Sequence, residues 1–287
     1  MITSLYLDDQ QGNTFTLVPN PLVTVTGVAM GFPAVRAIAE DRPDTDGSRD
    51  TTALISARAV SITAELYATP AALADAWRAF MAPRKRCYLY CTDSEWVGVR
   101  RILLRADQWS DPIAQGADDV FRAVQAQWVA PDGVWEDAVA TQVMIGAYAA
   151  GSTGMTFTGG MKFPIAWTAG VASTGTVINN AGALPLHFVA QLYGVCTGPL
   201  LVNDTTGKAM SFTNVFTVGA GSYVELNTRE RTSNLLSDPA QSQLGVMDLV
   251  NSVWWQLVPG VNSIRFVPLA GVQTGSSALI TYRQTYL

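Results

Sequence analysis

Tyr223-Val224-Glu225-Leu226-Asn227 and the later run Trp254-Trp255-Gln256-Leu257-Val258-Pro259-Gly260-Val261-Asn262-Ser263-Ile264-Arg265-Phe266 decide the fold. The first stretch alternates apolar and polar residues, which predicts a strand, and the polar run 227–234 after it predicts a turn. In the second, Pro259 presets φ and Gly260 tolerates a positive φ, so we expect the chain to reverse there. Ile264 and Phe266 then share one face of a strand. The two stretches predict antiparallel strand units that face each other across a loop, and they indicate no chemistry.

Length and composition bound the class of protein. A chain of 287 residues with 48% hydrophobic residues can bury one large core or two ordinary ones. Its net charge is −5 and it has no long basic run, which argues against a dedicated nucleic-acid-binding protein. Residues 1–140 hold 12 of the 18 basic and 18 of the 23 acidic residues. The C-terminal half is therefore almost free of charge.

The three cysteines do not predict a disulfide scaffold. Cys87 and Cys91 lie on one expected strand, so their Cα atoms should be about 13 Å apart, whereas a disulfide needs less than ~7 Å. The N-terminus has neither a basic segment nor an apolar core of a signal peptide, and no window approaches the ~18 apolar residues of a membrane span. We expect a protein that is made in the host cytoplasm and does not span a membrane.

Alternation and turn residues predict a mainly β N-terminal half with one helix. Thr69 fits an N-cap, Pro70 fits the first helical position, and Pro83 should stop the helix. The apolar stripe of this helix should pack on the sheet, and it consists of Leu73, Trp77, Phe80 and Met81. The expected strands are 2–7, 13–18, 23–28, 57–66, 87–91, 96–104 and 120–129. Small residues at 147–154 predict a linker, which places the domain boundary near residue 145 and gives domains 1–145 and 146–287.

The C-terminal half consists of short strand candidates separated by Gly, Asn and Pro turns. This pattern predicts a β-sandwich. The candidates are 155–157, 175–179, 186–193, 200–203, 208–212, 216–218, 223–227, 254–258, 263–267 and 278–282.

Candidate sites for chemistry are few. The spacing Asp44-x-Asp46-x-Ser48-x-Asp50 suggests calcium, but Gly47 and Ile55 do not match the EF-hand positions, so an exposed loop at 40–50 is favoured. The basic run Arg84-Lys85-Arg86 is compatible with a phosphate contact, although a solvated turn fits better. His187 is the single histidine, and we expect a half-buried structural residue inside a strand. No phosphate-binding loop or carboxylate pair is found. We predict no catalytic residue, no metal ligand and no cofactor, hence no enzyme.

Four pieces of the C-terminal half carry a resemblance to a known family. They are Ile178-Asn179-Asn180-Ala181-Gly182, Leu200-Leu201-Val202-Asn203-Asp204-Thr205-Thr206-Gly207, Gly221-Ser222-Tyr223-Val224-Glu225-Leu226-Asn227-Thr228, and the run from Trp255 to Phe266. In this order they resemble the distal tail proteins of long-tailed, non-contractile bacteriophages. The N-terminal half is similar too, through 42–47, where Thr45 departs from the family pattern, and through 128–133. The resemblance covers almost the whole chain.

The resemblance implies a split-barrel-like N-terminal domain with one packed helix and a galectin-like β-sandwich at the C-terminus. It implies a structural virion protein at the tail tip, in which N-terminal domains join side by side into a hexameric ring. The implied partners are the tail tube protein, the tail-tip spike or baseplate hub, the tape-measure protein and receptor-binding proteins. Genomic DNA would pass through the ring without specific binding, and an acidic lining from residues 1–140 would keep it sliding.

Two other functions stay open. A carbohydrate-binding module that contributes to host attachment could stack sugars on Trp254, Trp255, Trp167 or Tyr193, although only one of two adjacent tryptophans on a strand can face outward. A tail-associated hydrolase is the third possibility, and the sequence nominates no residue for it.

Overall fold

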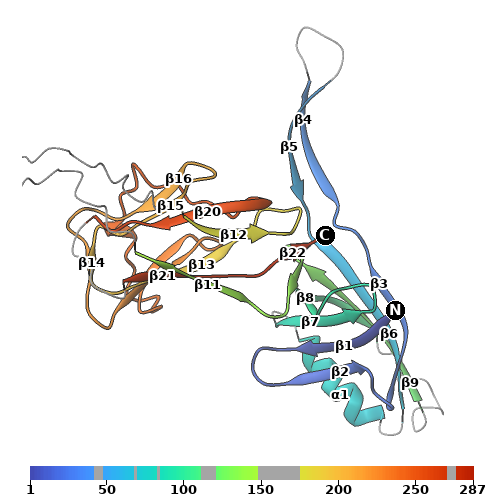
Figure 1. Cartoon of the computed structure of the whole chain (residues 1–287). Coiled ribbons are helices and arrows are strands. Elements are labelled where there is room, and N and C mark those ends of the chain that lie inside the picture. Colours follow the sequence, from blue (N-terminus) through green and yellow to red (C-terminus); the bar gives the residue numbers. More distant parts are fainter. Residues whose placement is uncertain (42–47, 68–69, 83–84, 111–120, 148–174, 270–275) are drawn as a thin grey trace, which may run out of the picture. The chain divides into compact units, whose positions relative to one another are not determined.

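The computed structural model describes residues 1–41, 48–67, 70–82, 85–110, 121–147, 175–269 and 276–287. These residues are mainly β with one α-helix, as predicted. It divides into two compact units, Met1–Val139 with Thr285–Leu287, and Ala140–Gln284 (Figure 1). Strand β11 (Thr141–Gly146) pairs along its length with β21 (Ser277–Tyr282) and lies in the second unit. The division thus falls before Thr141, whereas the predicted boundary lies near residue 145.

The first unit is built on one large, nearly closed, barrel-like sheet. The order of its main strands is β2 (Thr14–Val18), β1 (Ile2–Asp8), β7 (Arg86–Asp93), β8 (Arg100–Ser110), β9 (Phe121–Ala130), β6 (Arg58–Tyr67) and β3 (Val23–Met30). Short strands β10 (Trp135–Asp137) and β22 (Thr285–Tyr286) join at β8. All these pairs are antiparallel. Alternate residues of β6 are buried, from Arg58 to Leu66, as the period of two requires.

Helix α1 (Pro70–Phe80) fills the inside of this sheet. Ala74, Trp77, Phe80 and Met81 are buried, and Leu73 packs at the edge of the same core. The Trp77 ring meets Trp128 of β9 edge-on, with 5.6 Å between ring centroids. The predicted apolar stripe is thus confirmed, while the predicted cap Thr69 and stop Pro83 lie outside the described residues.

Strands β4 (Val35–Asp41) and β5 (Ser48–Ile55) form a separate two-stranded ribbon. In the described part of the chain this hairpin pairs with no other strand (Figure 1). The exposed loop predicted at 40–50 is therefore wrong in part, because ordered strands continue into it from both sides. The polar composition of 40–50 hid the strand character of Thr51, Thr52 and Ile55. Residues 42–47 lie outside the described residues.

The second unit is a sandwich of two antiparallel sheets around one core. One sheet has the order β11, β21, β13 (Phe188–Tyr193), β18 (Tyr223–Asn227), β19 (Thr232–Leu235), and the other β12 (Thr176–Asn180), β20 (Gly260–Phe266), β15 (Leu200–Asn203), β16 (Lys208–Ser211). Leu192 and Leu226 from the first sheet and Ile178 and Phe266 from the second lie in the same apolar cluster. A two-stranded pair, β14 (Cys196–Thr197) with β17 (Thr217–Val218), and a 3-10 turn, η1 (Leu244–Val246), complete the unit.

The two stretches 223–227 and 254–266 are arranged differently from the prediction. β18 pairs with β13 and β19, while β20 lies in the other sheet, so the two stretches do not pair with each other. Trp254–Val258 is not a strand, and only Leu257 forms a bridge, with Leu186. Gly260 has the positive φ, +87°, that the predicted turn requires, and the chain bends at Pro259 before β20 begins. The Asn262 side chain holds the segment before β20 in place. It accepts from the N–H of Val258 at 3.0 Å and donates to the carbonyl of Val258 at 2.8 Å.

Several other strand limits differ from the prediction, and β8 and β19 are two examples. β8 starts at Arg100, not Trp96, because Gly98 with φ +82° ends a turn there. The predicted turn at 227–234 contains the start of β19, which pairs with β18 as a hairpin. The candidate strand 155–157 lies outside the described residues.

Candidate functional site

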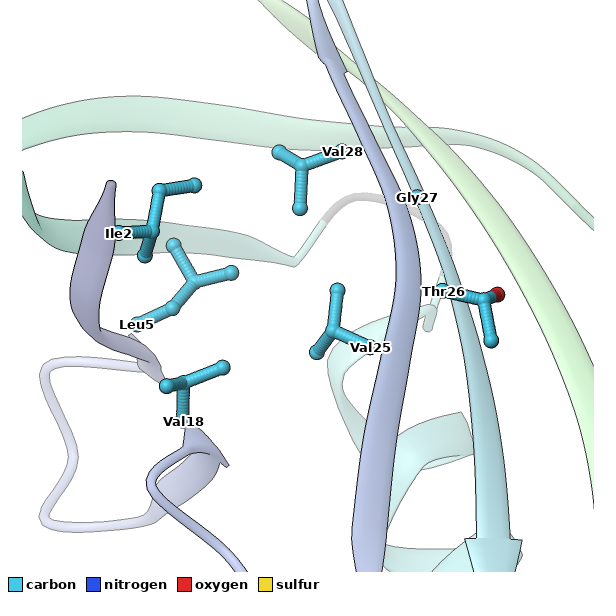
Figure 2. Close-up of a pocket in the computed structure, with 7 residues that line it drawn as sticks. All are labelled: Ile2, Leu5, Val18, Val25, Thr26, Gly27 and Val28. Atoms are coloured by element: carbon cyan, nitrogen blue, oxygen red, sulfur yellow. The ribbon is translucent and has the colours of Figure 1, made fainter.

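The barrel-like sheet of the first unit is not closed, and its open seam is a groove. The edge strands β2 and β3 are not paired to each other within the described residues, and a groove of about 350 Å³ lies between β1, β2 and β3. Figure 2 shows the side chains of Ile2, Leu5 and Val18 on one side and Val25 and Val28 on the other, pointing into the gap. Thr26 points away from the groove, and its hydroxyl donates to the carbonyl of Thr63 at 3.2 Å.

A β-bulge gives the groove its shape. The register of β3 on β6 shifts between Val25 and Gly27, so that the strand bends at this point. An apolar groove beside an unpaired strand edge can take an extended segment, which gains main-chain hydrogen bonds from the edge and buries alternate side chains in the groove. The groove lining contains no ionisable side chain, so it indicates packing rather than catalysis.

A stripe of aromatic and charged side chains lies on the outer face of the same sheet. The rings of Tyr6 and Tyr90 stack with centroids 4.7 Å apart and an interplanar angle of 2°. The guanidinium of Arg101 lies 4.1 Å from the Tyr88 ring centroid and 3.2 Å from a carboxylate oxygen of Glu136. Tyr and Arg are enriched in protein interfaces. This Tyr–Arg stripe, which the sequence did not indicate because its members come from β1, β7, β8 and β10, is a second candidate contact surface.

The basic run 84–86 has a structural role at Lys85. The Lys85 ammonium lies 2.9 Å from the buried carboxylate of Asp9 and 5.2 Å from the ring centroid of Phe80. The hydrogen bond from the Asn13 side chain, and then that from Lys85, hold the pKa of Asp9 well below its usual range. Arg84 lies outside the described residues. The ion pair engages Lys85, which weakens the phosphate hypothesis.

His187 precedes β13 rather than lying inside a strand. The amide nitrogen of Gln256 is 2.7 Å from its Nε2, and the hydroxyl of Thr228 is 3.5 Å from its Nδ1. Thr228 is itself buried and bonds both backbone groups of Phe188. The ring is half-buried in a network that fixes the start of β13, which agrees with the predicted structural role.

Neither metal nor thiol chemistry gains support from the structure. Among the described residues, no group of three His, Cys, Asp or Glu side chains is placed to hold a metal ion. The calcium candidates Asp44 and Asp46 lie outside the described part. Burial raises the pKa of the Cys87 thiol to about 12 and those of Cys91 and Cys196 to about 11, so reactive thiolates are disfavoured. In the described part of the chain, no helix is long and apolar enough to cross a membrane.

The aromatic residues proposed for sugar stacking differ in how far their side chains are exposed. Trp255 is 2% exposed and packs on Phe188 with 4.6 Å between ring centroids, so it cannot stack a sugar. Trp254 is half-exposed and packs against the core of the second unit. Trp167 lies outside the described residues. Tyr193 is half-exposed on the outer face of β13 beside Tyr223.

Comparison with solved structures finds proteins of similar architecture. The SPP1 Dit (gp 19.1) protein, described as a paradigm of the hub adsorption apparatus in phages that infect Gram-positive bacteria, aligns with a TM-score of 0.62 and 14% identity over 100% of both chains. The chain has the fold of a phage tail hub protein. The phage P2 baseplate in its activated conformation with Ca aligns with a TM-score of 0.57 and 10% identity, covering 99% of this chain and 98% of that one. The Sr form gives 0.55 and 10%, covering 98% and 97%.

Sequence comparisons add nothing to this likeness. No protein-family model and no curated protein matches the chain. At 10–14% identity, the hub-like fold includes both units, although sequence similarity is no longer detectable by those comparisons. The fold predicted from the resemblance is confirmed at the level of a mainly β hub architecture.

Proposed function

We propose that the chain is a structural protein of a phage virion, the distal tail hub of a long non-contractile tail. In this role it forms a hexameric ring at the tail tip through its first unit, and its second unit is a galectin-like sandwich. The ring joins the tail tube to the tail-tip spike or baseplate, the tape-measure protein and receptor-binding proteins. The observation that carries the proposal is the alignment with SPP1 Dit over 100% of both chains, which includes both units.

The edges of the first unit support assembly into a ring. The seam offers an unpaired strand edge beside an apolar groove, and the β4–β5 ribbon has no strand partner within the described residues. An isolated two-stranded ribbon is marginally stable in water, so a neighbouring subunit is its natural support. Phe32, between β3 and β4, is 89% exposed, and Val35, the first residue of β4, is 64% exposed. These features lie at different places on one unit, which is what a head-to-tail contact needs to close a ring.

The outer face of the long strands suits the passage of DNA. Outward positions on β6 and β9 include Ser61, Thr63, Gln125 and Gln127, which are small or uncharged. These positions of β6 and β9 offer phosphates no cation. On the neighbouring β8, the exposed Arg105 lies opposite Val129 on the same face. We therefore propose a lining that is largely neutral, with Glu65 as its acidic member, in place of the strongly acidic lining expected from composition.

Negative-stain microscopy and mass photometry of the purified full chain test the proposal. The expected result is a six-fold ring with an open centre at micromolar protein. Val28→Lys places a charge in the seam groove and should return the chain to monomers. Val139→Lys changes a residue of the first unit that is 80% exposed and outside the groove, and should leave rings intact.

Circular dichroism and thermal unfolding show whether both variants keep the wild-type fold. Rings that persist in a folded Val28→Lys variant contradict the seam as the contact. A wild-type chain that stays monomeric at every concentration contradicts self-assembly into the ring.

A further inference from the structure

The outer face of the five-stranded sheet in the second unit carries a polar–aromatic cluster, defined here as Gln191, Tyr193, Tyr223, Glu225 and Ser237. Register places these residues together, because Gln191 lies opposite Glu225 and Tyr193 lies opposite Tyr223 on β13 and β18. The two tyrosine rings are 5.0 Å apart between centroids, with an interplanar angle of 42°. All five side chains are half-exposed, so the cluster borders solvent.

Hydrogen bonds within the cluster converge on one oxygen of Glu225. The Gln191 amide donates to Glu225 Oε2 at 3.0 Å, and the Ser237 hydroxyl donates to the same oxygen at 2.6 Å. The Tyr193 hydroxyl donates to the Gln191 amide oxygen at 2.5 Å, and the Tyr223 hydroxyl lies 2.9 Å from the Ser237 oxygen. Each bond orients the next, so the carboxylate is held in one position.

The other oxygen of this carboxylate remains available. Within the described residues, Glu225 Oε1 has no hydrogen-bond partner, and Glu225 has no lysine or arginine partner. Asn234 lies opposite Glu225 on β19, and its side-chain amide also forms no hydrogen bond in the described part. A fixed carboxylate oxygen and an adjacent amide thus provide an acceptor and a donor, next to two aromatic rings.

Local backbone strain indicates that the cluster is more than a chance surface network. Leu236 and Ser237 have φ of 53° and 58°, at the centre of a turn closed by the N–H of Asp238 bonding the carbonyl of Leu235 at 3.0 Å. Such positions favour Gly, Asn or Asp, and other residues there carry a cost. The turn nevertheless holds Ser237 against Glu225. Strained residues that orient polar side chains gather at binding sites, since preorganisation lowers the cost of binding.

We propose that the polar–aromatic cluster is a saccharide-binding subsite. The C–H groups of a pyranose ring would pack on the Tyr193 and Tyr223 rings, as sugars pack on aromatic faces. Two neighbouring hydroxyls would then reach Glu225 Oε1, which accepts, and the Asn234 amide, which donates. A neutral sugar fits because its hydroxyls satisfy both groups. The site lies on β13, β18 and β19 and includes Tyr193, which the sequence suggested, but none of the suggested tryptophans.

The full wild-type chain is tested with methyl glycosides of glucose, galactose, N-acetylglucosamine and rhamnose, using saturation-transfer NMR and calorimetry. At least one glycoside should bind in the millimolar range. Glu225→Gln keeps the shape but removes the charge, and should weaken binding about tenfold or more, as expected for a charge-assisted hydrogen bond. Tyr193→Ala should abolish the transfer signal. Glu230→Gln, an exposed glutamate on the adjacent loop, should leave binding unchanged and serves as the matched control.

The outcomes distinguish failure of this proposal from failure of the proposed ring assembly. Binding is measured on the chain whether it is monomeric or assembled, so absence of rings does not affect the result. Unchanged circular dichroism of Glu225→Gln shows that lost binding is not lost folding. Failure of all four glycosides to bind overturns the proposal, as does binding that Glu225→Gln and Tyr193→Ala do not change. Tetramethylammonium binding without glycoside binding would assign the cluster to a cation and would also overturn it.

Discussion

The contact between helix α1 and the barrel-like sheet depends on one tryptophan. Trp77 is 1% exposed, and its ring lies edge-on to Trp128 at 5.6 Å and to Phe15 at 5.5 Å between centroids. Phe15 comes from β2 and Trp128 from β9, so this side chain ties the helix to two distant strands. We therefore expect Trp77→Ala to destabilise the whole first unit.

The size of the effect follows from the cavity that is created. Replacing a buried tryptophan by alanine costs about 3–5 kcal/mol, which is a large part of the roughly 5–15 kcal/mol that stabilises a domain. For a unit of this length, that loss should lower its unfolding temperature by roughly 10–15 °C. Trp77→Phe should cost much less, because the indole N–H of Trp77 has no partner among the described residues and its removal breaks no hydrogen bond.

Urea and thermal unfolding followed by far-UV circular dichroism measure the change. Trp109→Ala is the matched control, since Trp109 lies in the same unit but is 45% exposed, with the Arg78 guanidinium 5.8 Å from its ring centroid. The control should cost less than about 1 kcal/mol. Equal losses in the two alanine variants, or a loss below about 1 kcal/mol for Trp77→Ala, would refute the assigned core.

Three further predictions concern backbone, charge and thiols. In unfolding measurements, Gly194→Ala should destabilise the second unit strongly, since Gly194 has φ +86° and a Cβ there would lie 2.7 Å from the Cα of Ser276. Gly221 has φ +72° but open space around it, so Gly221→Ala should show only the strain of a positive φ. Because the native pKa of Asp9 is depressed, its contribution is complete above the unfolded pKa of about 3.9 and is lost as the pH falls below it. Urea unfolding from pH 2 to 6 should thus show Asp9→Asn less stable than wild type at pH 6, with the gap closing below about pH 4. A thiol reagent at pH 8 should label no cysteine in the native protein and three after denaturation, namely Cys87, Cys91 and Cys196.

Local sequence patterns predicted the elements whose partners are near in the chain or whose pattern is regular. The helix at Pro70–Phe80 carries its own start and its own apolar stripe, and β15 and β18 were predicted with the observed limits. Strand pairing was less accessible. β18 and β20 both have clear strand patterns, yet period-two alternation does not say which sheet a strand joins, so the predicted pairing between their stretches was wrong.

The candidate sites were mostly beyond local reasoning. The seam groove forms between β1, β2 and β3 because the sheet does not close, and no residue in those strands predicts the open seam. The polar–aromatic cluster needs the β13–β18 register and the turn at Leu236–Ser237, which the sequence presents only as a polar stretch. The sequence suggested sugar-stacking residues by residue type alone. Burial excludes Trp255 from such a role, whereas Tyr193 belongs to the polar–aromatic cluster.

The motifs that carried the resemblance to distal tail proteins turn out to be turn scaffolds. Asn180, Asn203 and Asn227 each end a strand, and each side-chain oxygen accepts from a backbone N–H two residues later, at 2.9, 3.0 and 3.0 Å. Asn180, Asn203 and Asn262 are at most 1% exposed. A buried asparagine with these bonds tolerates few replacements, since losing it leaves backbone groups unpaired.

This explains why the recognisable motifs indicate the fold more directly than they indicate the contact surfaces. Buried turn asparagines restrict sequence wherever the sandwich forms, so they indicate the fold whichever partners it binds. The seam and the β4–β5 ribbon leave strand edges unpaired within the described residues, so they are candidate contacts for neighbouring molecules, as is the Tyr–Arg stripe. Variants at Asn203 or Asn262 should thus unfold the second unit without informing on assembly, whereas Val28→Lys separates assembly from folding. Function in a chain of this fold is therefore to be sought in outward-facing residues that the recognisable motifs do not contain.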